Sequence, residues 1–445
     1  MRIFFVSLGC DKNLVDTEMM LGQLSLAGHS ITDDESNADA VVVNTCSFIH
    51  DAKKESIDTL LEMGKLRTEG KIKALVCCGC LAQRYENEIK ELIPEVDAVV
   101  GTMAIDEIVS AVEKAAAGEK CSFVKPLESP LVYGKKRMVT TGGHYAYLKI
   151  AEGCGKFCTY CAIPKMRGKY KSVPMESLLK EARELAEFGV KELILVAQET
   201  TIYGTDLYGE KKLPELLRKL SEIEDISYIR ILYCYPEEIN DELIAEIRDN
   251  KKICHYLDMP IQSGSDNVLK RMGRKTDVKS IEILVKKLRE EIPDIALRTT
   301  LISGFPGEKR RDFIETCEFV NKMKFDRLGV FTYSKEEDTV AAKMNGQLPE
   351  FVKKYRKDKL MKLQQAVSFA KAKEEVGRKL IVMVEGKMPD EDVYVCRTYK
   401  DAPNVDGYLF LETRQELMTG DLAKVVVTDA KEYDLTGVLE SEFTE

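Results

Sequence analysis

The sequence predicts a multidomain α/β protein, with a doubly wound α/β domain, then an open partial (β/α) barrel and finally a small antiparallel β-barrel. Three observations predict this order. Short apolar runs alternate with amphipathic helical stretches in residues 1–118 and again in residues 144–334. A segment rich in proline and glycine separates these two regions. Residues 379–445 change to the two-residue periodicity of strands.

The first region, residues 1–118, has the pattern of a parallel sheet covered by helices. Its apolar runs are short, continuous and rich in β-branched residues, which is typical of strands buried on both faces. The candidate strands are Ile3–Leu8, Ala40–Asn44, Ile72–Cys77 and Ala98–Val100. Amphipathic helical stretches follow the first, second and fourth of these runs and end at glycines. We therefore predict a doubly wound domain.

The second region follows a predicted linker at residues 119–143 and repeats the strand–helix pattern six times. The candidate strands are Ala146–Ile150, Glu192–Ala197, Tyr228–Cys234, Tyr256–Met259, Leu297–Ser303 and Leu328–Tyr333. A complete eightfold barrel takes about 250 residues, so six repeats predict an open partial TIM barrel. We assign residues 144–378 to this unit, including a basic helix at Pro349–Arg378 that should pack on the barrel.

The tail, residues 379–445, predicts a compact β-barrel of the oligonucleotide-binding type. Its candidate strands are Leu380–Val384, Val393–Arg397, Tyr408–Leu411 and Leu422–Thr428. Residues 381–445 hold fifteen acidic and six basic side chains, which accounts for the whole net charge of −9. An acidic module repels phosphate and attracts cationic surfaces. We expect it to bind a cationic protein, with nucleic acid the weaker candidate and a solubilising role the alternative.

Composition excludes several classes of protein. A hydrophobic content of 44% and a charged content of 32% are typical of a globular protein and not of a disordered or fibrous one. No apolar run reaches the ~18 residues of a membrane-spanning helix, and we expect no membrane partner. Thirteen cysteines without an export signal argue against disulfides and for the reducing cytoplasm.

Three cysteines form the most specific motif. Cys154, Cys158 and Cys161 have the spacing C-x-x-x-C-x-x-C directly after the first strand of the partial barrel, where barrel enzymes place their active sites. Cysteine thiolates hold iron–sulfur clusters. Three local ligands would leave one iron of a 4Fe-4S cluster open to a cofactor, whereas structural zinc requires a fourth protein ligand. The spacing favours a cluster, with zinc and unligated thiols as the alternatives.

A second set of three cysteines is spread along the first domain. Cys10, Cys46 and Cys80 each follow one of the first three candidate strands. Because the carboxyl ends of parallel strands meet at one edge, a second three-thiol cluster is reasonable there. The alternative is that these cysteines are small buried apolar residues, as we expect for Cys77 and Cys78.

Two other strand ends carry weaker signals. Gly304 and Gly307 follow a barrel strand and allow close backbone approach to a ligand, although a plain turn is an equal alternative. Gln198 ends another strand with a polar group at the same mouth. Arg167 follows the last cysteine of the loop and either neutralises a carboxylate at this mouth or lies on the surface. Since histidine clusters and triads are lacking, cofactors should supply the chemistry.

The cysteine loop resembles the signature of the radical S-adenosylmethionine enzymes. In them the open iron chelates the cofactor, and the aromatic residue before the third cysteine, here Tyr160, lies near the adenine. Together with the three earlier cysteines and a small terminal barrel of the TRAM type, the whole chain resembles the methylthiotransferases. This resemblance implies S-adenosylmethionine and two 4Fe-4S clusters as cofactors. It implies cofactor contacts at Tyr160, Gln198, Gly304, Gly307 and Glu308.

Within this family, several segments are similar to the branch that acts on small-subunit ribosomal protein twelve. They are Val6–Asp16, Cys46–Ile49, Leu195–Thr201 and Asp401–Gly407. Gln262–Ser265 is closer to the branch that acts on an adenosine of transfer RNA. The resemblance implies that a 5′-deoxyadenosyl radical removes hydrogen from the β-carbon of an aspartate, and that the second cluster supplies methylated sulfur. It also implies an electron-donor protein. Transfer RNA as substrate, and a non-catalytic iron–sulfur or zinc RNA-binding protein, are the alternatives.

Overall fold

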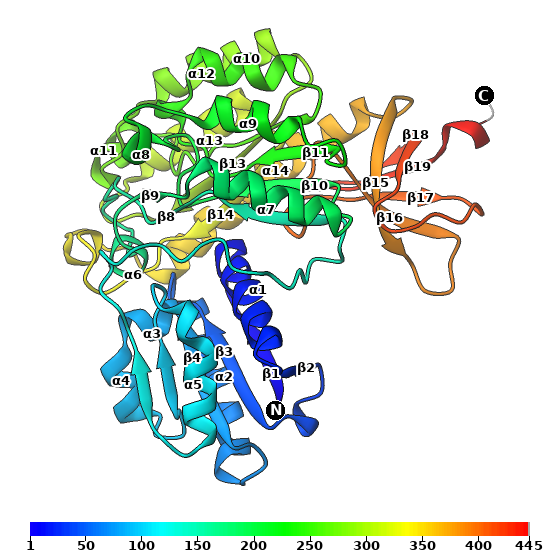
Figure 1. The fold of residues 1–445 in the computed structure, drawn as a ribbon. Helices are drawn as coiled ribbons and strands as arrows, with labels where there is room; N and C mark the ends of the chain where they lie inside the picture. The colour runs from blue at the N-terminus through cyan, green and yellow to red at the C-terminus, as the bar shows by residue number, and fades with distance from the viewer. Residues whose placement is uncertain (444–445) are drawn as a thin grey trace.

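The computed structural model describes residues 1–443, which form three units in chain order. An N-terminal unit runs from Arg2 to Phe123, a central unit from Tyr145 to Glu374, and a C-terminal barrel from Lys379 to Leu439. Figure 1 shows the blue to cyan N-terminal unit below the green and yellow central unit, with the orange and red barrel at one end. No helix within residues 1–443 is both long and apolar enough to cross a membrane.

The N-terminal unit contains a parallel sheet, as predicted, but the sheet has six strands where the sequence predicts four. Its strands lie in the order β2 (Ser30–Thr32), β1 (Arg2–Ser7), β3 (Ala40–Thr45), β4 (Ala74–Gly79), β5 (Ala98–Val100) and β6 (Cys121–Phe123). Every residue of β3 and β4 is buried, and alternate residues enter two separate apolar cores. The helices are α1 (Asp11–Leu26), α2 (His50–Thr68), α3 (Cys80–Arg84), α4 (Glu86–Leu92) and α5 (Ile108–Ala116).

The two edge strands β2 and β6 differ from the prediction. Each has three residues and none of them is buried, so neither carries the apolar run by which the sequence reveals a strand. β6 lies within residues 119–143, the predicted linker, and pairs in parallel with β5. The following residues 124–144 form no helix or strand in the described chain.

The central unit is an open barrel of six parallel strands, which confirms the predicted partial TIM barrel. The strands lie in the order β14 (Arg327–Thr332), β13 (Ala296–Ser303), β12 (Ile253–Asp258), β11 (Tyr228–Ile231), β10 (Glu192–Val196) and β7 (Tyr145–Lys149). The outer helices are α7 (Met175–Glu187), α9 (Leu213–Ser221), α10 (Asp241–Asp249), α12 (Val278–Glu291) and α13 (Arg310–Met323). Short elements at the carboxyl ends of the strands include α6 (Pro164–Arg167), α8 (Thr205–Tyr208) and α11 (Asp266–Met272).

Helix α1 of the N-terminal unit packs against the inner face of the central sheet. Met20 of α1 belongs to the same apolar core as Tyr147 of β7 and Val196 of β10. The Lys149 ammonium on β7 donates to the Asp16 carboxylate on α1. The two units therefore share one core, and the carboxyl ends of their strands are held facing each other.

Helix α14 (Glu350–Glu374) packs on β14 and α13, as predicted, through part of the predicted apolar stripe and through several polar residues. The sequence predicts a contact face of Leu360, Met361, Leu363, Val367 and Ala370. Leu360 is buried, Met361 and Leu363 are half-buried against the same core, and Ala370 is exposed. Polar side chains occupy much of the buried face because each bonds the central unit; Gln364, for example, donates to the Phe325 carbonyl at 2.8 Å. An apolar-stripe rule cannot detect such a face.

The C-terminal barrel is closed by five strands, one more than predicted. They are β15 (Lys379–Lys387), β16 (Val393–Thr398), β17 (Leu409–Glu412), β19 (Leu435–Leu439) and β18 (Leu422–Ala430), in this order around the barrel. Four pairs are antiparallel, and β17 pairs with β19 in parallel. The unpredicted strand β19 has Gly437 at its centre, which weakens the strand signal.

The barrel docks on the amino ends of the central strands through buried ion pairs. Glu192, the first residue of β10, accepts from Arg230 Nε and from Arg397 Nη2, each at 2.7 Å. Asp401 of the barrel accepts from Arg327, the first residue of β14. The barrel therefore lies at the end of the central unit opposite to the carboxyl ends of its strands.

The Asp401–Gly407 segment, which the sequence links to one branch of the family, serves this docking. Its Asp406 carboxylate accepts from Tyr256 Oη of β12 at 2.7 Å and lies 3.4 Å from Arg298 Nε of β13. Asp401 and Asp406 pair with arginines of the central unit, and Glu385 pairs with Arg397 within the barrel. Their charge is therefore used within the molecule.

Replacing Glu192 by glutamine should lower the free energy of unfolding by about 3–5 kcal/mol, because two buried arginines lose their counter-charge. Burial alone would raise the pKa of Glu192, but Arg397 and Arg230 outweigh it and lower the pKa to about 2. The stabilisation is therefore complete at neutral pH and is lost as the pH falls from about 4.5 toward 2. Urea unfolding at pH 7 and pH 3 measures both effects. Glu187→Gln, at an exposed position of α7, is the control, and equal stability of the two variants would contradict the prediction.

Candidate metal and cofactor centre

The first cysteine set, which we call the N-terminal trio (Cys10, Cys46 and Cys80), lies at one edge of the N-terminal sheet. These residues follow β1, β3 and β4, which are adjacent strands. Cys46 and Cys80 are buried and Cys10 is exposed. Burial raises the pKa of the Cys80 thiol to about 12; Arg167 opposes the shift, and Cys46 and Cys10 add to it. The fold thus brings the three thiols within electrostatic reach of one another.

Asn13 connects the loops that carry the N-terminal trio. Its Nδ2 donates to the carbonyl oxygens of Leu8 and Thr45, each at 3.0 Å, just before the first two cysteines. Its Oδ1 accepts from Cys80 Sγ at 3.5 Å. The side chain is fully buried, so water does not compete for these bonds. One amide therefore holds three loops, a role that the spacing of the cysteines does not reveal.

Cys77 and Cys78 are fully buried on β4 and point into the two cores on opposite faces of the sheet. The Cys78 thiol donates to the Val43 carbonyl at 3.5 Å. Both residues are therefore small buried core residues, as the sequence suggests, and neither lies in the loops that carry the N-terminal trio.

Two glycines allow the loops of the N-terminal trio to come together. Gly9 and Gly79 precede Cys10 and Cys80 and have φ values of 94° and 93°. A Cβ on Gly9 would lie 2.9 Å from the Cβ of Cys46, and one on Gly79 would lie 2.2 Å from the Asn44 side-chain oxygen. Both the backbone conformation and the close contact require glycine.

We expect Gly79→Ala to lower the free energy of unfolding by about 3–5 kcal/mol, since it adds backbone strain to overpacking. Gly70→Ala is the matched control: its φ is 71°, but a Cβ there would meet no atom within 4 Å. Gly70→Ala should lower the free energy of unfolding by only about 1 kcal/mol, because it carries the penalty of the positive φ without a close contact. Thermal unfolding of the two variants measures the difference, and equal losses would show that the close contact does not matter.

The second cysteine set, which we call the loop trio (Cys154, Cys158 and Cys161), follows β7 and the short strand β8 (Ala151–Glu152). Burial raises the pKa of Cys154 to about 11 and of Cys161 to about 12, and each thiol also interacts with Cys158. Thr159 anchors the loop because its N–H and its hydroxyl donate to the carbonyls of Met272 and Arg271, each at 2.9 Å. The loop is thus fixed to α11 across the barrel mouth.

The other residues expected to contact a cofactor lie around this loop. The Tyr160 ring packs edge-on against Phe305, with centroids 6.4 Å apart, so the loop touches the segment of Gly304 and Gly307. The Glu308 carboxylate accepts from the Gly304 N–H at 3.0 Å and from Arg356. Glu308 therefore bonds its own loop, and its contact with a cofactor stays a prediction.

Several buried polar atoms near the loop trio have no hydrogen-bond partner among the described residues. Gln198 Nε2 donates to Glu152 at 2.8 Å, but Gln198 Oε1 is unpartnered. Glu199 Oε2 and two nitrogens of Arg274 are unpartnered as well. The Arg274 guanidinium lies 4.3 Å from the centroid of the Tyr235 ring and within electrostatic reach of Cys158. Since buried polar groups are normally satisfied, these atoms fit a polar ligand such as S-adenosylmethionine.

Arg274, Glu199 and Tyr235 are candidate site residues that sequence reasoning did not select. Glu199 follows Gln198 and carried a weak signal, whereas Arg274 and Tyr235 belong to no recognisable pattern. Burial raises the pKa of Glu199 to about 7 although Lys156, 3.6 Å away, lowers it. A carboxyl group of this kind can be neutral or ionised near physiological pH.

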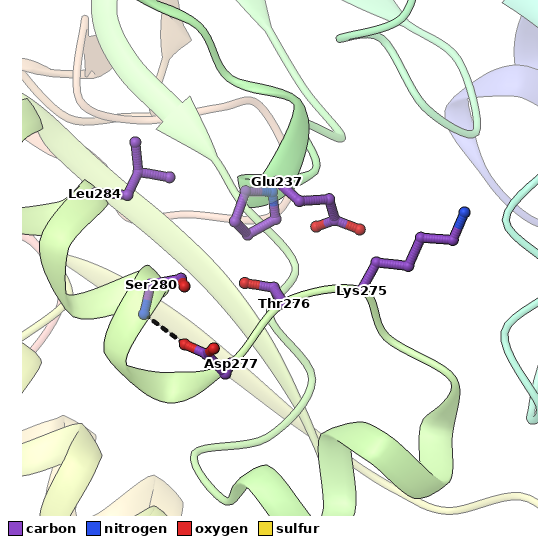
Figure 2. A pocket seen from close by; sticks show the side chains of 7 residues that line it. Glu237, Lys275, Thr276, Asp277, Ser280 and Leu284 are labelled. Atoms are coloured by element: carbon purple, nitrogen blue, oxygen red, sulfur yellow. Dashed lines mark hydrogen bonds between the residues drawn. The ribbon is translucent and has the colours of Figure 1, made fainter.

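A cavity of about 410 Å³ opens beside the loop trio and not at it. It is lined by Pro236, Glu237, Lys275, Thr276, Asp277, Ser280 and Leu284 (Figure 2). Figure 2 shows the Asp277 carboxylate accepting from the Ser280 N–H, which caps α12. Glu237 connects the cavity to the centre because its carboxylate lies 3.6 Å from Arg274. The lining contains no cysteine, so this cavity is separate from the thiols of both trios.

Residues beside the two trios are in contact across the interface between the units. Cys80 packs against Ala162 and Met166, which directly follow the loop trio. The Ser47 hydroxyl, next to Cys46, donates to the Met166 sulfur at 2.8 Å. In the part of the chain that the structure describes, no three His, Cys, Asp or Glu side chains are spaced as ligands of a single metal ion. A cluster distributes its three cysteines over different iron atoms and so takes more widely spaced thiols.

Arg167 is buried at this interface and not on the surface. Its Nη1 donates to Asp16 Oδ2 at 2.6 Å and to Glu152 Oε2 at 3.0 Å. The expectation that it neutralises a carboxylate is therefore met by two carboxylates, one from each unit.

Three family models match the chain. An uncharacterised protein family, UPF0004, matches residues 2–101, the radical SAM superfamily matches residues 148–320, and the TRAM domain matches residues 376–439. The two cysteine trios fall within the first two matches.

The chain is similar over its full length to curated proteins of one kind. It is 58% identical over 440 residues to the ribosomal protein uS12 methylthiotransferase RimO of Lachnoclostridium phytofermentans, covering 99% of this chain and 100% of the relative. It is 48% identical over 444 residues to the protein of the same name from Clostridium botulinum strain Hall, covering 100% and 99%.

Solved structures share the fold at low sequence identity. The radical S-adenosylmethionine methyltransferase TsrM from Kitasatospora setae superposes with a TM-score of 0.54 at 13% identity, covering 74% of this chain and 72% of that one. The cobalamin-dependent radical enzyme OxsB superposes with a TM-score of 0.52 at 14% identity, covering 82% and 56%.

Proposed function

The chain belongs to the family of ribosomal protein uS12 methylthiotransferases, and we propose that it methylthiolates the β-carbon of a specific aspartate in uS12, the small-subunit ribosomal protein twelve. It is a radical S-adenosylmethionine enzyme and uses this cofactor and an iron–sulfur cluster. The second cluster, the residues that hold each group and the role of the barrel are parts of the proposal.

The observation that carries the proposal is the meeting of the two trios across one interface. A reaction that joins a sulfur-containing group to an unactivated carbon needs the radical source and the sulfur carrier at the same substrate atom. Cys80 packs on the residues that follow Cys161, so groups held by the two trios would face the same space. The loop trio would hold the cluster that binds S-adenosylmethionine, and the N-terminal trio would hold the second.

When bound, these groups supply the carbon radical that removes the substrate hydrogen and the methylated sulfur that replaces it. The protein's own residues orient and enclose them. Gln198, Glu199 and Arg274 present unpartnered polar atoms to the cofactor, and Tyr160 offers an aromatic face for the adenine. Gly304 and Gly307 have φ values of 74° and 81°, and Cβ atoms there would lie 2.4 Å from Lys353 and 2.5 Å from Arg271, so packing also requires these glycines and their contact with the cofactor is part of the proposal.

Lys12 and Tyr233 form a contact between the two units near Cys10. The Lys12 ammonium lies 3.2 Å from the centroid of the Tyr233 ring, and Tyr233 Oη donates to Asp11 at 3.0 Å. This contact joins α1 to the carboxyl end of β11.

The acidic barrel is the proposed contact for the cationic substrate protein. Three of its acidic side chains are paired with arginines within the molecule, so the charge available to a partner comes from the others. The exposed ones are Asp390, Glu391, Asp392, Glu412, Glu416, Asp429, Glu432 and Glu442. They would attract a protein that is rich in lysine and arginine, and they would oppose binding to free RNA. We also propose a cytoplasmic location and an electron-donor protein, since the chemistry begins with a one-electron reduction.

The experiment compares two substrates under the same conditions. Anaerobically reconstituted enzyme with S-adenosylmethionine and a reductant is incubated with uS12 or with transfer RNA, and mass spectrometry detects an added methylthio group. We expect the modification on one aspartate of uS12, and none after that aspartate is replaced by asparagine. Modification of transfer RNA alone would overturn the proposed substrate while leaving the reaction type intact.

The transfer RNA alternative had one motif in its favour, Gln262–Ser265. In the structure this segment joins β12 to α11 and is engaged in packing: a Cβ on Gly264 would lie 2.8 Å from Phe319. Ser265 Oγ donates to Glu315 at 2.8 Å. These internal contacts give the motif a structural reason that does not depend on the substrate.

A further inference from the structure

Arg167 places a charged donor from the central unit against a thiol of the N-terminal unit. It is the last residue of α6, and its side chain is 3% exposed. Its Nε–H donates to Cys80 Sγ at 3.3 Å. This hydrogen bond joins residues 87 positions apart in the sequence, so it exists only when the two units are packed together.

The two Nη atoms of Arg167 are also hydrogen-bonded, and these bonds fix the orientation of the Nε–H toward Cys80 Sγ. Nη1 donates to Asp16 and Glu152, and Nη2 donates to Asn13, the amide that holds the three loops. The planar fork of arginine satisfies such a set of acceptors, whereas the single ammonium of lysine does not.

Arg167 is not the only cation beside the carboxylates of Asp16 and Glu152. Lys149 also pairs with Asp16 and Glu152, so two cations face two carboxylates and the thiol. Glu152 accepts from Gln198 at 2.8 Å on its other oxygen. A continuous chain of bonds therefore runs from Cys80 through Arg167 and Glu152 to a residue expected to contact S-adenosylmethionine.

We propose that Arg167 is a positioning residue for the second cluster: it donates a hydrogen bond to the Cys80 ligand sulfur and thereby retains the cluster and raises its reduction potential. The proposal rests on the proposed second cluster. Hydrogen bonds and positive charge at ligand sulfur stabilise the reduced, more negative cluster. Groups that hold a ligand in place typically contribute 10–100-fold to metal affinity. The radical-generating unit thus completes the sulfur-carrying site of its neighbour.

The test uses the full chain with the loop trio replaced by alanine, so that only the second cluster can form. Into this background we introduce Arg167→Gln, which removes the charge, and Arg167→Lys, which keeps the charge and loses the fork. Each protein is reconstituted, iron release to a chelator is timed, and the cluster is titrated with reductant while its electron paramagnetic resonance signal is followed. We expect Arg167→Gln to release iron about 10-fold faster and to have a more negative potential, with Arg167→Lys between it and the parent.

Arg137→Gln is the matched control. Arg137 is equally buried and also links the units, through Glu18 of α1 and Glu181 of α7, but its described hydrogen bonds include no cysteine. It should change unfolding stability without changing the potential. If Arg167→Gln and Arg137→Gln match the parent in potential and iron release, the role of Arg167 is overturned. If the parent with the loop trio removed binds no iron, the second cluster itself is wrong and Arg167 has no such role.

Discussion

The Cys154→Ala variant is expected to form no 5′-deoxyadenosine and no methylthiolated uS12, with both products at the level seen without enzyme. Cys154 belongs to a trio in which the spacing offers no fourth cysteine, so its loss leaves two thiols for a cluster that needs three. Iron per reconstituted chain should fall from about eight atoms to about four. Chromatography of the nucleoside, mass spectrometry of uS12 and iron analysis measure the three quantities.

The control for this variant is Cys317→Ala. Cys317 is half-buried on α13, and the charged groups near it are Lys359, Glu308 and Glu318, not another cysteine. It should keep both products and all of the iron. If Cys154→Ala retained cleavage of S-adenosylmethionine, the loop trio would not be the radical source, and the site assignment would have to be abandoned.

The Cys80→Ala variant is expected to separate the two halves of the reaction. Its loop trio is intact, so 5′-deoxyadenosine should form at a rate of the same order as in the parent. Methylthiolated uS12 should be absent, because the proposed sulfur carrier loses one of three ligands and its iron. The ratio of methylthiolated uS12 to 5′-deoxyadenosine, measured in one incubation, is the decisive quantity, and it should fall from near one to zero.

Cys77→Ala is the matched control for Cys80→Ala. Cys77 lies three residues earlier and is fully buried, but it points into an apolar core. Its replacement should cost about 1 kcal/mol of stability and leave the product ratio unchanged. A Cys80→Ala protein that still modified uS12 would show that the N-terminal trio is not the sulfur-carrying site.

Long apolar strands and closely spaced cysteines could be predicted from the sequence because their signals are local. Strand β3 (Ala40–Thr45) is a continuous apolar run that ends in two polar residues, and the loop trio occupies eight consecutive residues. The strands β2, β6 and β19 could not be predicted, since three-residue edges and a central glycine leave no pattern. The sheet order around the N-terminal trio followed from a general rule about parallel strands.

The polar groups that complete the site could not be predicted, because their partners are distant in the chain. Arg167 donates to Asn13, 154 positions away, and to Asp16, 151 positions away. Arg274 belongs to no motif and is recognisable only by the unpartnered nitrogens near Cys158. Such contacts depend on how the sheets of the N-terminal and central units pack together. This packing cannot be predicted from a local pattern of residues.

The C-terminal barrel docks on the amino ends of the central strands, so a partner bound by the barrel, as proposed, would be held at the end opposite to the cysteine trios. Figure 1 shows α6, next to the loop trio, and β15 of the barrel at opposite ends of the central unit. Buried ion pairs such as Glu192–Arg397 keep this separation constant. If the acidic barrel binds the substrate protein as proposed, that protein must extend a protruding loop to reach the cysteine trios. A short peptide around the aspartate would then lack the contact with the barrel and should be a poorer substrate than the whole protein.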